Sequence, residues 1–192
     1  MKIKKNIDKI CIETDVYYQA LIKSDEALKR KEYDLALDIL DKAIKLNEEL
    51  NGCIGERADY YVRSAIVCRT KKDCNSELAF LTKAVELRGW DWDLQKRGQV
   101  YEEMGDFAAA IADYTKAIEA GGEPHSYELR AMTYFKKADY ESAIVDFTKA
   151  IESCGDMKCK GCVENRAYIE KAKEKLLYWL LTNKQTKGVK DE

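Results

Sequence analysis

The sequence is poor in residues that interrupt helices, and it carries almost no excess charge. It has one proline and ten glycines in 192 residues, which leaves few of the residues that usually form the turns of a β-sheet. Thirty-three lysines and arginines face 35 aspartates and glutamates, so the net charge of -2 gives no drive toward nucleic acid or anionic lipid. Alanine, leucine, isoleucine, lysine and glutamate dominate, and this composition predicts an all-α chain without a nucleic-acid partner.

Long apolar runs are also lacking. The first ten residues carry charges too frequently for a signal peptide. The longest apolar run near the C-terminus, residues 176–181, has six residues, whereas a membrane-spanning helix needs roughly 20. We therefore expect a cytoplasmic protein with no membrane partner, in which the seven cysteines are free thiols.

A segment of the chain recurs at an offset of 33 residues. Residues 110–119 (AIADYTKAIE) and 143–152 (AIVDFTKAIE) agree at eight of ten positions. A further step of 33 residues toward the N-terminus reaches residues 81–86 (LTKAVE), and a step of 41 from there reaches residues 40–45 (LDKAIK). Four recurring units at such a period predict stacked supersecondary units.

One unit has the pattern of two helices joined by a tight turn. Apolar and small residues of the third unit fall at helical spacings on both sides of Gly105 and Asp106. Gly98 and Ala110 are small enough to let the two helices approach closely, and Tyr114 would fill the space beside them. The pattern predicts a helix-turn-helix unit.

This pattern resembles the tetratricopeptide repeat family, whose 34-residue units are helix pairs. The resemblance implies an all-α, right-handed superhelical solenoid of four units in residues 17–157, starting near residues 17, 58, 91 and 124. Residues 1–16 would form a partly helical N-terminal extension, residues 158–182 a cysteine-containing loop and a capping helix, and residues 183–192 a flexible tail. The apolar stripe of the capping helix consists of Ala167, Ala172, Leu176, Trp179 and Leu180.

The second and fourth units depart from the family pattern. Glu77 stands where the family has a small residue, so either the second helix is shifted and Ala79 faces its partner, or the packing is looser. Cys68 and Cys74 replace aromatic residues, and we interpret them as small core residues. In the fourth unit, Ala138 replaces the turn glycine.

Residues suited to catalysis are scarce. The chain has one histidine, no phosphate-binding glycine loop and no nucleophile elbow. Its carboxylates lie at helix-surface spacings beside lysine and arginine, as on solvated helix faces. We therefore predict a non-catalytic protein without a cofactor.

Residues 154–162 (CGDMKCKGC) form an exception, because three thiols lie within nine residues. Cys159 and Cys162 make a C-x-x-C, which can supply half of a structural zinc site. Antiparallel helices would place His125 beside Cys154, so a set of three cysteines and one histidine is conceivable, but no second C-x-x-C supports it. We favour a flexible loop with exposed or incidentally clustered free thiols and no metal, with a metal site or a regulated disulfide as the alternative.

The resemblance also implies a partner-binding groove. In the family, positions 2, 5, 6, 9, 12 and 13 of each first helix line the concave side. Here these positions mix charges with aromatic and apolar residues, which suits a peptide or an amphipathic helix. The candidate partner-binding residues are Tyr18, Leu21, Asp25, Asp59, Arg63, Trp92, Lys96, Gln99, His125 and Met132. We expect Trp92 to anchor the partner and Trp90 to pack between repeats.

Some family members clamp the carboxylate of chaperone tails with lysine and asparagine at groove positions. Those positions hold Leu21, Asp25 and Arg63 in one frame, and Val62, Ile66 and Lys96 in the other, so the clamp is absent.

The leading prediction is a protein-protein interaction adaptor. One alternative is a self-associating scaffold, a homo-oligomer held through Leu176, Trp179 and Leu180. The other is a metal- or redox-responsive protein that uses Cys154, Cys159 and Cys162.

Overall fold

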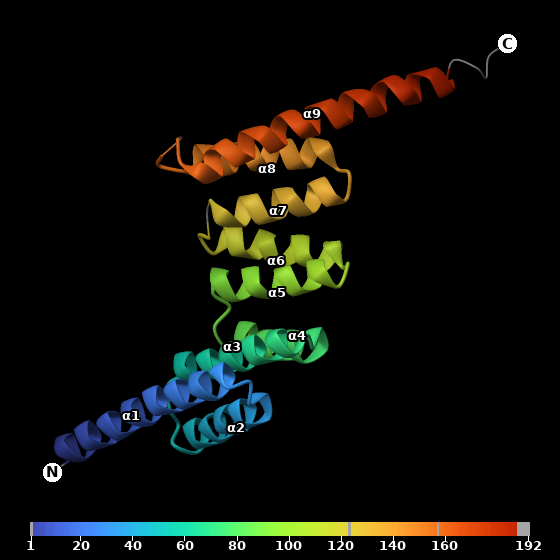
Figure 1. Cartoon of the computed structure of the whole chain (residues 1–192). Coiled ribbons are helices and arrows are strands. Elements are labelled where there is room, and N and C mark those ends of the chain that lie inside the picture. Colours follow the sequence, from blue (N-terminus) through green and yellow to red (C-terminus); the bar gives the residue numbers. More distant parts are fainter. Residues whose placement is uncertain (1, 123, 157, 188–192) are drawn as a thin grey trace. The chain divides into compact units, whose positions relative to one another are not determined.

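The computed structural model describes residues 2–122, 124–156 and 158–187, and it describes side chains in these ranges from residue 16 to residue 181. Within them the chain forms α-helices and turns and no β-strand (Figure 1). The nine helices of this described part are α1 (Lys2–Lys29), α2 (Tyr33–Glu49), α3 (Ile54–Lys71), α4 (Cys74–Leu87), α5 (Asp91–Glu103), α6 (Phe107–Glu119), α7 (His125–Lys136), α8 (Tyr140–Glu152) and α9 (Lys160–Lys187). The predicted all-α class is confirmed.

The chain divides into two compact units, each of which holds more than one repeat: the first unit ends at Asp93 and the second unit begins at Leu94. The division falls in the first turn of α5. In the first unit α1 contacts α2, α2 contacts α3, and α3 contacts α4. In the second unit α6 contacts α7, α7 contacts α8, and α8 contacts α9. Each unit is therefore built from helices that pack on their neighbours along the chain, as in helical-repeat proteins.

The turns inside three of the helix pairs share one construction. An aspartate caps the second helix by accepting a hydrogen bond from the backbone N–H three residues later, at Asp73, Asp106 and Asp139. The residue before each aspartate is left-handed, with φ of 60° at Lys72, 82° at Gly105 and 61° at Ala138. Both features recur every 33 residues, so the sequence period is also the period of the turns.

Small residues dominate the core of the first unit. Ala27 of α1 is buried, Ala36 and Leu40 of α2 are inaccessible to solvent, and Tyr60 and Val67 of α3 fill the space between them. Because alanine lets the helices approach closely, larger, partly buried side chains such as Tyr17, Leu21 and Leu28 pack directly against these residues and complete the core.

Of the two expectations for the second repeat, the shifted α4 is wrong, and the looser packing stays a prediction. Ala79 is exposed, so the helix is not shifted toward it. Glu77 is 3% exposed at the small-residue position, where its Oε1 accepts a hydrogen bond from Arg69 Nε at 2.7 Å. A buried carboxylate needs such a partner, and the ion pair keeps the family register. Cys68 is buried as expected, whereas Cys74 is only half-buried.

The second unit is held by a close helix crossing and by two equivalent ion pairs. A Cβ placed on Gly98 of α5 would lie 2.6 Å from Tyr114 Cε1 of α6, so the predicted close approach is confirmed. The guanidinium of Arg97 donates two hydrogen bonds to Asp113, both at 2.7 Å. One repeat later, Arg130 donates to Asp146 at 2.6 and 2.9 Å. These bidentate pairs join the first helix of each repeat to its second.

The terminal helix α9 covers α8. The ring of Tyr168 stacks on Phe147 with centroids 5.3 Å apart, and Cys162, Asn165 and Ala172 are buried. Helix α9 extends five residues beyond the predicted end at residue 182, so residues 183–187 of the predicted flexible tail are helical. Residues 188–192 of that tail lie outside the described residues.

The predicted stripe of α9 is wrong for three of its five residues. Ala172 is buried and Leu176 half-buried, but Ala167, Trp179 and Leu180 are exposed. For Trp179 and Leu180 the reason is length, because at about 1.5 Å per residue the 13 residues of α8 span only half the distance of the 28 residues of α9. Ala167 lies within the covered part of α9 but on its exposed face. Figure 1 shows α9 running on past α8.

Candidate partner-binding surface and cysteine cluster

Four predicted groove residues lie on α1 and on the facing side of α3. Asp25 of α1 and Arg63 of α3 form an ion pair with Oδ1 and Nη1 3.2 Å apart, and each side chain is about one third exposed. Tyr18 of α1 is exposed, whereas Leu21 is half-buried against the core of the first unit. The structure therefore brings the predicted charged residues of α1 and α3 together, and Asp25 and Arg63 form an ion pair with each other.

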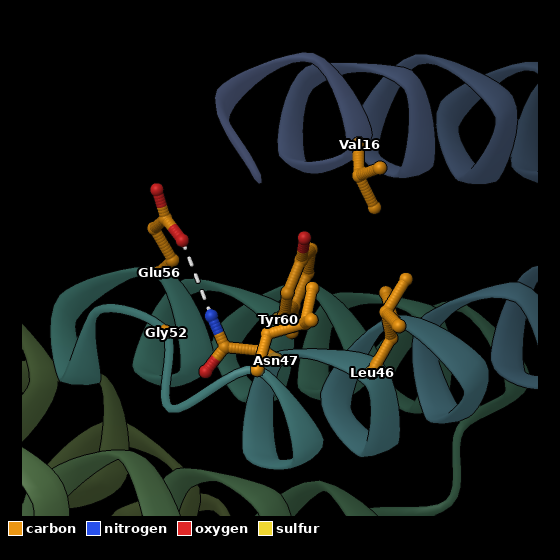
Figure 2. Close-up of a pocket in the computed structure, with 8 residues that line it drawn as sticks. Val16, Leu46, Asn47, Gly52, Glu56 and Tyr60 are labelled. Carbon is orange, nitrogen blue, oxygen red and sulfur yellow. Dashed lines mark hydrogen bonds between the residues drawn. The ribbon is translucent and has the colours of Figure 1, made fainter. Parts of the chain in front are cut away.

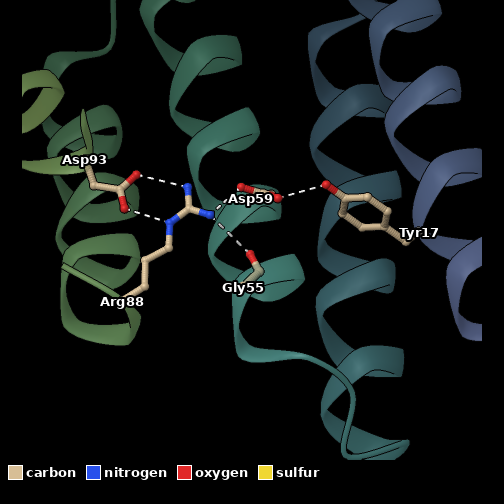
Figure 3. A network of polar contacts seen from close by, with 5 residues as sticks. All are labelled: Tyr17, Gly55, Asp59, Arg88 and Asp93. Carbon is tan, nitrogen blue, oxygen red and sulfur yellow. Dashed lines mark hydrogen bonds and ion pairs between the residues drawn. The ribbon is translucent and has the colours of Figure 1, made fainter. Parts of the chain in front are cut away.

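Asp59, also predicted to contact a partner, belongs to an internal network (Figure 3). Its Oδ2 accepts a hydrogen bond from the Tyr17 hydroxyl at 2.8 Å, and its Oδ1 accepts one from Arg88 Nη1 at 2.6 Å. Arg88 donates two further bonds to Asp93, at 2.7 and 3.1 Å. Burial and the neighbouring Asp59 raise the pKa of Tyr17 well above its usual range, which keeps the donor protonated.

This network gives Asp59 a structural role. The side chains of Arg88 and Asp93 are 9% and 0% exposed, so both charges are buried and each needs an oppositely charged partner. Asp59 contributes to this compensation by pairing with Arg88. Sequence reasoning missed both residues, because Arg88 follows the last turn of α4 and lies outside the repeat signature. The signal available was a charged residue directly after a helix end, which is also common on ordinary surfaces.

The two tryptophans near the start of α5 are both on the surface. Trp92 is 43% exposed, as an anchor for a partner requires. Trp90 was expected to pack between repeats, and this is wrong: it is 58% exposed, and the Arg88 guanidinium lies over its ring at 4.2 Å.

The predicted groove residues of the second unit have mixed environments. Lys96, Gln99 and Met132 are half-buried, and Met132 packs against the cluster around Phe147. His125 is exposed, with its Nδ1 3.4 Å from Glu128 Oε2.

Glu102 lies in the middle of another polar network that joins α5, α6 and α7. It accepts hydrogen bonds from the hydroxyls of Thr133 and Tyr114, and it pairs with Lys136. Burial and the adjacent Glu102 raise the pKa of Tyr114. The Tyr114 hydroxyl therefore stays a hydrogen-bond donor. The network around Glu102 joins the third repeat to the fourth.

Hollows on the surface differ greatly in size. The small one in Figure 2, bounded by Val16, Leu46, Asn47, Gly52 and Tyr60, encloses only about 10 Å³, close to the space of a single water molecule. Asn47 Nδ2 donates to Glu56 Oε2 across it at 3.1 Å. It is therefore a packing defect rather than a ligand site.

Two larger hollows are open grooves that sequence reasoning did not find. One, of about 470 Å³, lies between α1 and α2 and is lined by Val16, Ala20, Ile39 and Leu46 among others. The other, of about 480 Å³, lies where α9 passes the start of α8, beside Tyr140, Leu176 and Trp179.

Cys154, Cys159 and Cys162 come together at the junction of α8 and α9. Their Sγ atoms all lie within 4.8 Å of one another, and those of Cys154 and Cys159 are 3.4 Å apart. Cys162 is 2% exposed. The three thiols are therefore clustered, but His125 is not part of the cluster, because its exposed ring is directed to Glu128.

Cys159 and Cys162 differ in acidity. The Cys162 backbone N–H donates to Cys159 Sγ at 3.4 Å and, with the neighbouring Cys154 side chain, lowers the pKa of the Cys159 thiol. Burial raises the pKa of Cys162 to about 12. Cys159 is consequently the more acidic of this pair.

A chain of helix-turn-helix units that pack in succession defines a helical-repeat protein. Residues 94–120 and 124–156 match the family model of the tetratricopeptide repeat. These two segments are tetratricopeptide repeats, as the sequence predicts.

Solved structures with the same fold include a tetratricopeptide repeat protein from Parabacteroides merdae ATCC 43184, with a TM-score of 0.69, 20% identity, and coverage of 83% of this chain and 61% of that one. MamA from Desulfovibrio magneticus RS-1 has a TM-score of 0.60 and 16% identity, with coverage of 93% of this chain and 98% of that one. YrrB, described as having an unusual peptide-binding site, has a TM-score of 0.60 and 19% identity, with coverage of 79% of this chain and 73% of that one.

At these identities the likeness concerns the fold alone. The chain also spans only about 61% of the length of the Parabacteroides merdae protein. No curated protein matches the chain. Among the helices of the described residues, none is both long and apolar enough to cross a membrane.

Proposed function

We propose that this protein is a non-catalytic scaffold that binds a peptide or an amphipathic helix of a partner protein with the first helices of its repeats. The tetratricopeptide repeat fold favours a protein-protein interaction scaffold, because stacked helix pairs present extended surfaces to a partner. YrrB supports the peptide as ligand, since it shares the fold and is described by a peptide-binding site.

One observation carries the proposal: large apolar side chains remain exposed at groove positions of the first unit. Tyr18 and Ile22 on α1 are 57% and 51% exposed, and Ile66 on α3 is 37% exposed. Ile22 lies one turn before Asp25, and Ile66 lies one turn after Arg63, which pairs with Asp25. We call Tyr18, Ile22, Asp25, Arg63 and Ile66 the first-unit surface.

The chemistry of the first-unit surface suits an amphipathic segment. Tyr18 is a rigid aromatic residue that can anchor a partner, with Ile22 and Ile66 as apolar surroundings. The pair of Asp25 and Arg63 offers both signs of charge, which can fix the direction of the bound segment. Trp92 occupies the equivalent of the Tyr18 position in the third repeat, and its exposure marks it as a second anchor.

The test begins with a displayed library of random peptides selected on the full-length protein. The dissociation constant of a selected peptide is then measured for single variants. We expect Trp92→Ala to raise the Kd about 30-fold, equivalent to about 2 kcal/mol, and Tyr18→Ala to raise it about fivefold. Arg63→Glu should mainly slow association and change its salt dependence.

Leu35→Ala is the matched control, because Leu35 is 47% exposed but lies on the second helix of the first repeat. Its affinity should equal that of the unmodified protein. Unchanged affinity in Tyr18→Ala and Trp92→Ala, with a lowered Tm for the latter, would assign Trp92 to packing and reject the proposal.

A second candidate, self-association, is favoured by the end of α9. Five consecutive residues, Leu177 to Leu181, are between 43% and 70% exposed. Five successive residues surround a helix on all sides, so this segment is apolar all round, as helices buried between neighbours are. A second copy of the chain would cover it.

A further inference from the structure

We propose that Cys154, Cys159 and Cys162 bind one thiophilic metal ion of the Zn²⁺ class, with its fourth coordination position facing a small cavity beside α7. The proposal goes beyond the scaffold function and does not depend on it. It rests on the spacing of the three sulfur atoms, on the way the chain holds them, and on a buried oxygen atom that has no partner.

The sulfur positions are close to those of a metal-bound set. In a tetrahedral site with Zn–S bonds of about 2.3 Å, the sulfur atoms lie roughly 3.8 Å apart. Here the Sγ atoms of Cys154 and Cys159 are 3.4 Å apart, and all three lie within 4.8 Å. A disulfide would use two of these thiols and leave the third idle, whereas a metal uses all three.

Backbone hydrogen bonds hold the loop that carries these thiols. The Asp156 carbonyl accepts hydrogen bonds from the Cys159 N–H at 3.1 Å and from the Cys154 thiol at 3.3 Å. Cys159 lies directly before α9, and its carbonyl accepts the bond of Val163 N–H at 3.1 Å, so it is the N-cap of this helix. A helix N-terminus favours the negative charge that a thiolate brings.

The independent observation is Asn165, one turn after Cys162 on the same face of α9. It is 4% exposed, and its Oδ1 has no hydrogen-bond partner among the residues described. A buried amide oxygen without a partner is costly and needs an explanation. Asn165 lines the same cavity of about 80 Å³ as the three cysteines, together with Glu128 of α7. A metal ion, or a water bound to it, supplies the missing partner.

The charges around the cluster are compatible with this site. Three thiolates and one divalent cation leave a net charge of -1, and Lys158 and Lys160 flank Cys159, Lys160 being paired with Glu164. The carboxylate of Glu128, which lines the cavity, adds a negative charge that favours the cation. The metal would join the end of α8, through Cys154, to the start of α9, through Cys159 and Cys162. It would therefore secure the helix that covers the last repeat, and its binding would add to the stability of the second unit.

The experiment uses the reduced full-length protein under anaerobic conditions. Zn²⁺ is titrated in competition with a chromophoric chelator, and Co²⁺ serves as a spectroscopic probe. We expect one ion per chain and thiolate-to-Co²⁺ charge-transfer absorption. At Zn²⁺ about 100-fold above the Kd, the Tm should rise by about 5–10 °C.

Variants test the ligands one at a time. Cys154→Ser and Cys159→Ser, both at half-buried positions, should each weaken Zn²⁺ binding at least about tenfold. Asn165→Ala should weaken it about 10- to 100-fold while the charge-transfer absorption persists, because Asn165 supports the site without contributing a thiolate. The matched control Cys11→Ser/Cys53→Ser/Cys74→Ser removes three other thiols and should bind as the unmodified protein does.

Three results would overturn the proposal. The reduced protein could bind no stoichiometric Zn²⁺ and instead form a disulfide between Cys154 and Cys159 on mild oxidation, which would make the cluster a redox site. The cluster variants could bind Zn²⁺ as tightly as the unmodified protein does. The control variant could lose binding to the same extent as Cys159→Ser, which would place the metal elsewhere.

Discussion

Gly98 and Tyr114 show how one small side chain can determine a helix crossing. Tyr114 is inaccessible to solvent, and its ring lies where a Cβ on residue 98 would have to go. The Tyr114 hydroxyl is also held by Glu102 at 3.3 Å, so the ring cannot move aside freely. The absence of a side chain at residue 98 is therefore a packing requirement of the second unit.

Gly98→Ala should reduce the free energy of unfolding by about 1–3 kcal/mol, because the added methyl group overlaps a fixed ring. Urea denaturation monitored by circular dichroism measures the loss. Gly161→Ala is the control, because a Cβ there meets nothing within 4 Å and α9 gains a better helix former. Equal stability of Gly98→Ala and the unmodified protein would mean that α5 and α6 cross elsewhere.

Three of the helix-turn-helix elements share an aspartate cap but differ in the residue before it. Gly105 takes the left-handed conformation without steric cost, whereas Ala138 adopts the same conformation with φ of 61°. For an L-residue this conformation costs roughly 1–2 kcal/mol, and glycine recovers it at the expense of about 0.4–1 kcal/mol of unfolded-state entropy. The fourth repeat therefore carries strain that the third repeat avoids.

Ala138→Gly should accordingly raise the free energy of unfolding by about 0.5–1 kcal/mol, and Gly105→Ala should lower it by a similar amount. The pair is well matched, because a Cβ on Gly105 meets no atom within 4 Å and the change is limited to the backbone. Thermal unfolding of both variants measures the difference. A loss of stability in Ala138→Gly would show that the methyl group makes a contact worth more than the strain.

At the scale of the whole molecule, the end of α9 presents a run of five consecutive exposed apolar residues. The helix covers α8 with its first half, while the segment from Leu177 to Leu181 remains exposed. Exposed apolar area of this kind marks an interaction surface or an aggregation risk. Which of the two applies depends on whether the contact between copies is closed and saturable.

We expect the full-length protein to form a discrete oligomer, with a mass that doubles as concentration rises through the micromolar range. Trp179→Glu combined with Leu181→Glu should keep it monomeric, because two buried charges oppose the contact. Light scattering coupled to gel filtration measures the mass, and Val145→Glu, at a 52% exposed position on α8, is the control. A monomer at all concentrations, or unlimited growth of mass, would exclude this scaffold role.

Local patterns in the sequence contain the elements of this fold. The 33-residue offset predicts the helix pairs, and Gly98 predicts their close crossing, because helix periodicity, caps and turns depend on residues within a few positions of one another. The same spacing places Asp106 and Asp139 at equivalent caps. For the same reason the amino-acid sequence alone indicates the family and the candidate groove positions.

The polar partnerships and the exposed surfaces depend on the tertiary structure. Glu77 is tolerated in a small-residue position because Arg69 reaches it, and Asp59 is engaged because Tyr17 and Arg88 meet it from other helices. The distances between the thiols of the cysteine cluster follow from how one loop closes. Such contacts depend on how far side chains reach between packed helices and in which direction they point. The order of residues along the chain does not specify these distances.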